Sequence, residues 1–412
     1  MVENTSWGEE GTTQRPSSYG WVIVAACSLM IFVSYGFIYS YSVFFKPLAD
    51  YFQWDRASVS LIYSLSMIIR GAAAIGTGWL ADKYGARKIM VFCGLMMAAG
   101  YLLSSRVSAL WHFFVTYAII EAIGVSGIFG IGSALASRWF TRNRGLALGI
   151  VASGSGLGTL LIVPATERLV SAVDWSQTFV IIGIAAGVLM VGAALFLKEP
   201  PQLAKTTTEQ GKPSATLGGA IKDKRFWLVM VCFLLFLFAT QMVLVHLVNY
   251  ATDIGIDPLV AATFVSVIGA VSIAGRLSTG VIAEKIGLYK SLVLICICLG
   301  LSFILLLFTR SVWSFYIFAV LFGVAYGGEV TQIPLVISRF FGTRVMATLM
   351  GVVLFVTGFG GAAGPWIAGK IYDVTASYNW AFIIGVLASA LCIVTVWLLK
   401  RVEEIESERN FS

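Results

Sequence analysis

Long apolar stretches separated by short polar segments run along nearly the whole chain. A helix needs about 20 apolar residues to cross a bilayer, and the stretches reach that length. We predict an all-α membrane protein with twelve transmembrane helices, at residues 20–43, 55–80, 89–106, 111–137, 145–167, 175–197, 226–251, 258–282, 289–309, 313–338, 346–368 and 378–400. The lipid bilayer is therefore its expected surroundings.

Composition supports this class. The chain has 412 residues, of which 58% are hydrophobic and 12% charged, and its mean hydropathy is +0.88. The net charge of +7 does not indicate nucleic acid, because the basic residues gather in alternate loops. With the N-terminus inside, cytoplasmic segments hold 20 of the 28 Lys and Arg residues, outer segments hold 6 and spans hold 2. This asymmetry predicts that both termini are cytoplasmic.

Two loops of the first half return in the second half. The segment 78–88 matches 280–290 at an offset of 202 residues, and 138–142 matches 339–344 at an offset of 201. We therefore predict two homologous six-helix bundles, residues 1–198 and 226–412, each with a short cytoplasmic tail, joined by a cytoplasmic linker at 199–225. Two such halves suit alternating access, with the substrate held near the midplane.

Arg276 lies inside an otherwise apolar predicted helix. A charge at membrane depth costs several kcal/mol unless it is paired or faces a wet cavity, so an arginine there indicates a functional site. Its planar guanidinium fits a carboxylate bidentately and stays charged at physiological pH. A structural ion pair is the alternative. Four tyrosines with apolar faces are candidate hydroxyl donors to a 2-hydroxy or 2-keto acid: Tyr35, Tyr39, Tyr117 and Tyr326.

Three further ionisable residues lie well inside the spans: Arg70, Glu121 and Glu329. Glu121 is a possible neutraliser of Arg70 in a structural or gating pair, although helical rise places them about 12 Å apart in depth. Glu329 is predicted within reach of Arg276 and is the first candidate for proton coupling, because a carboxyl in low dielectric binds a proton more readily. Asp253 and His246 are weaker proton candidates.

The loop at 78–88 resembles the signature loop of the major facilitator superfamily at every defining position. The resemblance implies the fold of that family and a conformational latch on the cytoplasmic side, where acids and bases pair across the closed halves. The expected latch residues are Gly78, Asp82, Lys83, Gly85, Arg87 and, from the repeat, Glu284.

The segment 138–158 is similar to the monocarboxylate transporter signature at span 5. This resemblance covers most of the chain and implies that Arg276 binds the substrate carboxylate. Tyr39 stands where many animal members carry a lysine, and Ser272 where they carry an aspartate, so this chain departs from the usual proton relay. Bacterial oxalate and formate exchangers are also similar, but span 11 here lacks their lysine.

Enzyme motifs are missing from the sequence, which has no phosphate-binding loop and no Cys and His cluster at metal-ligand spacing. We expect no cofactor and no metal, and all six cysteines are interpreted as packing residues. The predicted function is proton-coupled symport of small monocarboxylates, of the lactate and pyruvate type, in a bacterial plasma (inner) membrane, with a monomer sufficient. The alternatives are a carboxylate exchanger of the oxalate and formate type and a non-transporting sensor with a transporter fold.

Overall fold

The computed structural model describes residues 18–54, 56–200 and 217–411, so the predicted N-terminal tail and most of the predicted linker lie outside the described residues. Twelve helical stretches of the described residues are long and apolar enough to cross a membrane, which confirms the predicted spans. The first half contains α1 (Ser18–Tyr39), α2 (Tyr41–Phe52), α3 (Arg56–Tyr84), α4 (Ala86–Ser104), α5 (Leu110–Phe113), η1 (Phe114–Glu121), α6 (Ala122–Ser126), α7 (Ile128–Trp139), α8 (Arg144–Val173) and α9 (Trp175–Leu195).

The second half has longer, less interrupted helices. It contains α10 (Leu217–Lys222), α11 (Lys224–Asp253), α12 (Pro258–Ile286), α13 (Leu288–Phe308), α14 (Val312–Phe341), α15 (Met346–Thr375) and α16 (Asn379–Phe411). The last helix continues beyond the predicted end of its span at residue 400, into the predicted tail. Helix α10 is a short turn inside the predicted linker.

The fourth span is built differently from the others. Residues Leu110–Trp139 form one span, but the chain passes through α5, the π-helix η1, α6 and α7. A π-helix bonds each residue to the fifth before it and is wider than an α-helix. Ideal α-helical rise therefore misjudges the position of residues at its end, including Glu121.

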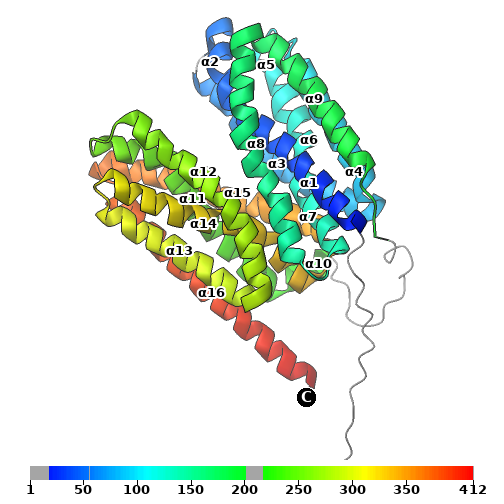
Figure 1. Ribbon diagram of the computed structural model, residues 1–412, viewed down its shortest axis with the longest axis vertical. Helices are drawn as coiled ribbons and strands as arrows, with labels where there is room; N and C mark the ends of the chain where they lie inside the picture. Colours follow the sequence, from blue (N-terminus) through cyan, green and yellow to red (C-terminus); the bar gives the residue numbers. More distant parts are fainter. Residues whose placement is uncertain (1–17, 55, 201–216, 412) are drawn as a thin grey trace, which may run out of the picture.

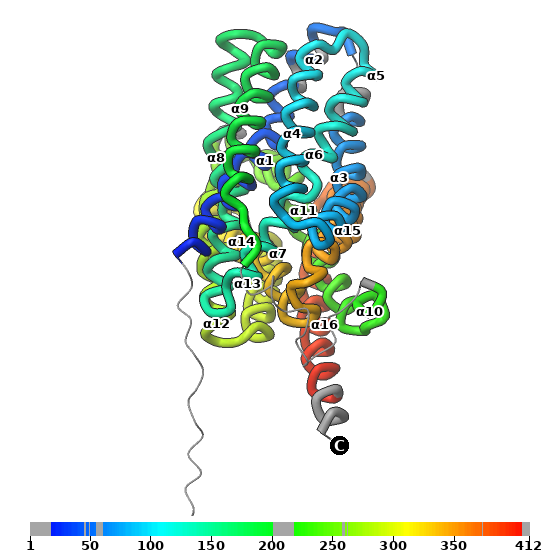
Figure 2. Tube along the Cα trace, turned by 90° about the vertical axis from the view of Figure 1, so that its right-hand side faces the viewer, coloured from blue at the N-terminus to red at the C-terminus, as the bar shows by residue number. Residues whose placement is uncertain are grey.

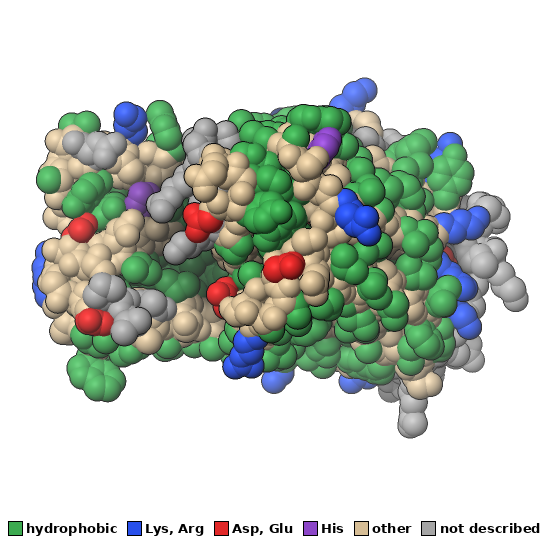
Figure 3. Space-filling view, turned by 90° about the horizontal axis from the view of Figure 1, so that it is seen from above, with side chains coloured by type: hydrophobic (Ala, Val, Ile, Leu, Met, Phe, Trp, Pro, Cys, Tyr) green, Lys and Arg blue, Asp and Glu red, His purple; other side chains and the backbone are tan. Residues whose placement is uncertain are grey.

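The two halves form separate bundles that diverge toward one side of the molecule (Figure 1). The start of α1, α10 and the end of α16 all lie at the other side, which we call the linker side (Figures 1 and 2). Viewed from the side opposite the linker, the surface is hollowed between the halves, and acidic side chains lie on the rim (Figure 3). We call this hollow the cleft.

Two helix pairs join the halves on the linker side, and glycines let their backbones touch. In the pair of α3 and α15, a Cβ atom on Gly78 would overlap the carbonyl oxygen of Ala347. In the pair of α8 and α12, Gly145 and Gly280 each face the other's carbonyl oxygen. A side chain at these positions would force the halves apart, so glycine is required for closure.

The close approaches at glycines end near mid-depth. Along α3 and α15 the last of them joins Gly71 to Phe355. Along α8 and α12 the last joins Gly156 to Ile273 and Arg276. The floor of the cleft therefore lies at the level where these two helix pairs separate.

Candidate functional site

Arg276 lies at this floor. Helix α12 is seated on α14 by close backbone approaches at Gly275 and Gly327, and the hydroxyl of Thr331 donates to the carbonyl oxygen of Arg276 at 3.0 Å. The guanidinium then extends to the opposite half, where Nη1 lies against Gly156 of α8. Arg276 thus bridges the two halves at the point where they part.

The guanidinium of Arg276 is buried but unpaired. The residue is only 4% exposed, and its Nε and Nη1 atoms have no hydrogen-bond partner among the described residues. No described carboxylate forms an ion pair with it, Glu329 included. A buried cation without a counter-ion is costly, so the arrangement is suited to an anion that arrives from outside.

Three of the four predicted tyrosines lie within electrostatic range of this cation. Tyr35 and Tyr39 of α1 and Tyr326 of α14 are each close enough to interact electrostatically with Arg276. Tyr39 is 41% exposed, in agreement with a position on the cleft. Tyr117 lies elsewhere: it is 1% exposed and packs on Tyr41, at a ring-centroid distance of 4.8 Å, inside the first half.

Arg70 lies near the same floor and has a partner. Its Nη2 is 3.6 Å from Oε2 of Glu121, and the side chains are 16% and 0% exposed. The predicted pairing of Arg70 with Glu121 therefore forms, and Glu121 stands at the end of the π-helix η1. Tyr35 and Tyr39 interact electrostatically with Arg70 as well as with Arg276.

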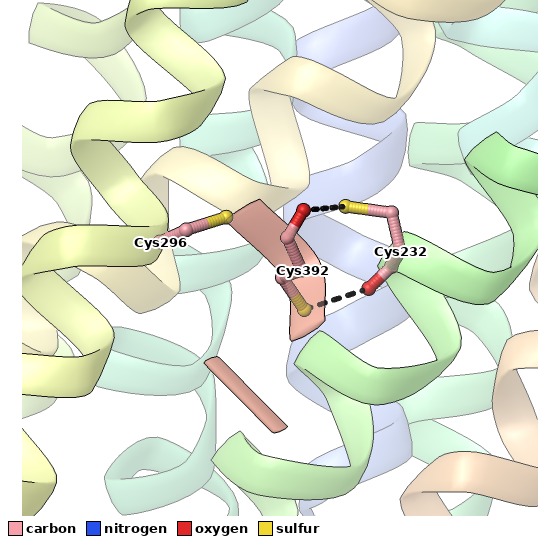
Figure 4. A group of neighbouring side chains, drawn as sticks. All are labelled: Cys232, Cys296 and Cys392. Carbon is pink, nitrogen blue, oxygen red and sulfur yellow. Dashed lines mark hydrogen bonds between the residues drawn. The ribbon is translucent and has the colours of Figure 1, made fainter. Parts of the chain in front are cut away.

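Glu329 is buried inside the second half at 2% exposure, and its Oε2 lacks a hydrogen-bond partner. It interacts electrostatically with two of the cysteines that converge there, Cys232 and Cys296. The sulfur atoms of Cys232, Cys296 and Cys392 lie within 4.8 Å of one another (Figure 4). The Cys392 thiol donates to the carbonyl oxygen of Cys232 at 3.3 Å, and we assign no ligand to this cluster.

The predicted latch loop bridges the halves on the linker side. Asp82 accepts hydrogen bonds from the Thr348 amide at 2.9 Å and its hydroxyl at 2.7 Å, and pairs with Arg138 at 2.6 Å. Arg138 also donates to the carbonyl oxygens of Thr343 and Arg344. The carboxylate of Asp82 thus caps the N-terminus of α15, where the helix dipole favours an anion.

The repeat provides a second, weaker contact of the same type. Glu284 accepts a hydrogen bond from the amide of Gly145 at 2.5 Å, at the N-terminus of α8. Gly85 and Gly287 begin the following helices with φ of 95° and 91°, a conformation that favours glycine. Lys83 is exposed and lies over the rings of Trp79 and Tyr84.

Comparison with known proteins decides the family. The model of the Major Facilitator Superfamily matches residues 27–365. The chain belongs to the major facilitator superfamily. Members of this superfamily are transporters, a non-enzymatic class.

Relatives of this transporter cover most of its length. Human monocarboxylate transporter 12 is 26% identical over 96% of this chain and 84% of its own. The oxalate:formate antiporter of Oxalobacter formigenes is 26% identical over 89% of this chain and 88% of its own.

Solved structures agree on the fold. The E. coli fucose:proton symporter superposes with a TM-score of 0.75 at 14% identity, over 93% of this chain and 99% of that chain. A structure of a major facilitator superfamily transporter in the outward conformation gives a TM-score of 0.72 at 15% identity. It covers 92% of this chain and 98% of that chain. These likenesses establish the fold of the transporter.

The remaining predicted proton candidates of this transporter lie away from the cleft floor. His246 Nε2 is 2.9 Å from the carbonyl oxygen of Pro365, to which it must donate, so Nδ1 accepts from the Tyr378 hydroxyl at 3.1 Å. His246 is thus fully hydrogen-bonded within the second half. Asp253 is exposed at the end of α11, within hydrogen-bonding range of the Tyr372 hydroxyl.

Several residues of the site were missed by sequence reasoning. Arg138 was noticed only as part of a repeated loop, yet it joins Asp82 to the opposite half and also pairs with Glu199 at 3.2 Å. Arg87 belongs to the same motif but is exposed and forms no ion pair within the described part of the chain. Gly156 lies against the guanidinium of Arg276 and belongs to none of the predicted sites. Its spacing from Gly149 by seven residues on α8 is the signal that places both on the face that meets α12.

Proposed function

We propose that this transporter is a proton-coupled symporter of small monocarboxylates, of the lactate and pyruvate type. The observation that carries the proposal is the buried guanidinium of Arg276, which has no carboxylate partner among the described residues and lies where the halves separate. One unpaired cation matches one carboxylate, and the guanidinium fork suits bidentate binding.

The tyrosine hydroxyls give the site its selectivity. Tyr35, Tyr39 and Tyr326 supply donors beside the cation, while their rings supply apolar walls for a short acyl chain. This combination fits a 2-hydroxy or 2-keto acid. The name of the human relative, a monocarboxylate transporter, supports the same substrate class.

The arrangement of the halves supports alternating access. The cleft is hollowed on the side opposite the linker, and the latch closes the linker side. Release on the linker side requires the contacts of Asp82 and Glu284 to break. The excess of basic residues on the linker side supports a cytoplasmic location for it and for both termini, in a bacterial inner membrane. One chain contains both halves, so a monomer suffices.

Uptake into proteoliposomes tests the proposal. Labelled lactate should accumulate when an inward proton gradient is imposed and should only equilibrate without one. Accumulation that ignores the proton gradient, while an internal carboxylate stimulates it, would instead establish an exchanger.

The exchanger of the oxalate and formate type is the second candidate, and Arg70 favours it. A dianion needs two fixed cations, and Arg70 lies close to the same tyrosines as Arg276. Oxalate uptake driven by a membrane potential at equal pH would support this candidate. Binding of lactate without any uptake would support the third, a sensor with a transporter fold.

A further inference from the structure

We infer that Glu121 is the proton-binding group of this transporter, and that Arg70 moves from Glu121 to the substrate carboxylate when Glu121 takes up a proton. The inference rests on the proposed function, because it names the coupling group of that site. It differs from the sequence-based assignment of the proton to Glu329.

The geometry of the ion pair is the first argument. A buried pair that serves only the fold is expected to be short and bidentate, since its desolvation must be repaid by hydrogen bonds. Here Nη2 of Arg70 and Oε2 of Glu121 are 3.6 Å apart, and neither atom has a hydrogen-bond partner among the described residues. Nε of Arg70 also lacks one. The pair is neutralised but loosely held.

The position of the pair is the second argument. Arg70 precedes Gly71, the glycine of α3 farthest from the linker side that closely approaches the opposite half, and its charge acts on the cleft tyrosines Tyr35 and Tyr39. Glu121 lies behind it at 0% exposure. Arg70 therefore lies between the carboxylate of Glu121 and the cleft. Its guanidinium can turn toward the carboxylate or toward the cleft.

The charged and titratable neighbours of the Arg70–Glu121 pair, among the described residues, come from α3, α4 and η1. The Tyr101 hydroxyl of α4 donates to Oε1 at 3.0 Å, and Arg70 of α3 supplies the positive charge. Tyr117 of η1 and Tyr63 of α3 are the other titratable neighbours of the pair. Among the described residues, Arg70 is the only charged side chain that acts on Glu121.

The backbone around Glu121 is fixed. Glu121 ends the π-helix η1, and Gly100 of α4 packs directly on its backbone, where a Cβ atom would lie 2.7 Å from the Glu121 nitrogen. Single turns of π-helix are frequent at functional sites. The carboxylate is thus held in place, while the long side chain of Arg70 is the part that can move.

The charge balance follows from this exchange. A hydronium ion in the cleft gives up a proton: one of its O–H bonds breaks, an O–H bond forms on the carboxylate of Glu121, and a neutral water molecule is left. Arg70 then faces the substrate anion together with Arg276. In the empty carrier, Arg276, Arg70 and ionised Glu121 carry one net positive charge. In the loaded carrier, the two arginines, neutral Glu121 and the bound monoanion carry the same net charge, so the coupled cycle is electroneutral. Binding of proton and anion is mutually favourable, as symport requires.

Matched isosteric variants of the two buried carboxyls test the inference. Glu121→Gln still accepts the Tyr101 hydrogen bond and mimics a permanently protonated group. It should keep lactate exchange across the membrane but lose proton-driven accumulation, and its lactate affinity should no longer vary with pH. Glu329→Gln should accumulate lactate as the wild type does.

The outcomes separate the inference from the proposed function. Wild-type protein whose lactate binding and uptake ignore pH would overturn proton-coupled symport itself. Wild-type coupling that persists in Glu121→Gln, or that is lost in Glu329→Gln alone, would overturn only the role of Glu121.

A second variant guards against misfolding of the first. Tyr101→Phe removes the hydroxyl that donates to the ionised carboxylate, so protonation should become easier and the pH profile of lactate binding should move to higher pH. A profile that stays in place, in a variant with wild-type thermal stability, would contradict proton binding at Glu121.

Discussion

Arg276 and Arg70 both lie near the floor of the cleft, and they are held in opposite ways. Arg276 reaches from one half to the other and has no ion-pair partner among the described residues. Arg70 is paired with Glu121 inside its own half. The first is therefore a permanent site for an anion, and the second becomes available only when its partner is neutral. A proton-coupled carrier of monoanions needs one cation that is always available and one that is released by protonation. A carrier of dianions needs two cations that are always available.

The same substitution at both arginines should give the largest difference. Arg276→Lys keeps the charge but loses the bidentate fork, and one lost hydrogen bond to a charged group costs about 1.5–3 kcal/mol, or roughly a 10- to 100-fold weaker binding of lactate. Arg70→Lys also keeps the charge, and because Arg70 is only the second cation on the carboxylate, beside Arg276, uptake should fall less, by roughly fivefold.

Initial uptake rates at several lactate concentrations measure both effects. Arg168→Lys, an exposed arginine on α8, is the matched control and should leave uptake unchanged. Near-normal uptake by a folded Arg276→Lys variant would remove Arg276 from the site. A loss in Arg70→Lys as severe as that in Arg276→Lys would show that the two arginines are equally exposed to substrate.

Gly156→Ala should have a smaller effect through the same arginine. A Cβ atom at this position would overlap Nη1 of Arg276, so the guanidinium must shift away from α8. The guanidinium is then displaced from the place where it would bind the carboxylate, and we expect lactate affinity to fall about tenfold, or about 1.4 kcal/mol. Gly192→Ala on α9, where a Cβ meets nothing within 4 Å, is the control. Unchanged affinity in Gly156→Ala would mean that the arginine does not bind substrate from this position.

The sequence alone predicted the features that depend on local pattern. The twelve spans follow from the length of the apolar runs, and Arg276 follows from the cost of a charge inside one of them. The latch loop was predicted from its resemblance to the signature loop of the superfamily, although the pairing of Asp82 with α15 requires the two halves to be in contact.

What the sequence could not predict depends on contacts between distant helices. The three converging cysteines come from α11, α13 and α16, so no spacing along the chain brings them together. Glu329 lies on α14, a helix buried on most of its surface, so hydrophobic periodicity does not show which face meets the cleft. The π-helix that ends at Glu121 has no clear sequence signal, and it decides whether Arg70 has a partner.

Tyr39→Phe should have the smallest effect, and it tests whether the anion held by Arg276 is a hydroxy acid. Tyr39 is the most exposed of the cleft tyrosines and interacts electrostatically with both arginines. Losing one neutral hydrogen bond costs about 0.5–1.5 kcal/mol, so lactate should bind roughly 2- to 10-fold more weakly. Propionate lacks the 2-hydroxyl group and should bind to the variant and the wild type equally well. Competition of unlabelled lactate and propionate against labelled lactate gives both affinities, and an equal loss for the two acids would show that Tyr39 contacts the carboxylate, which both share, rather than the hydroxyl.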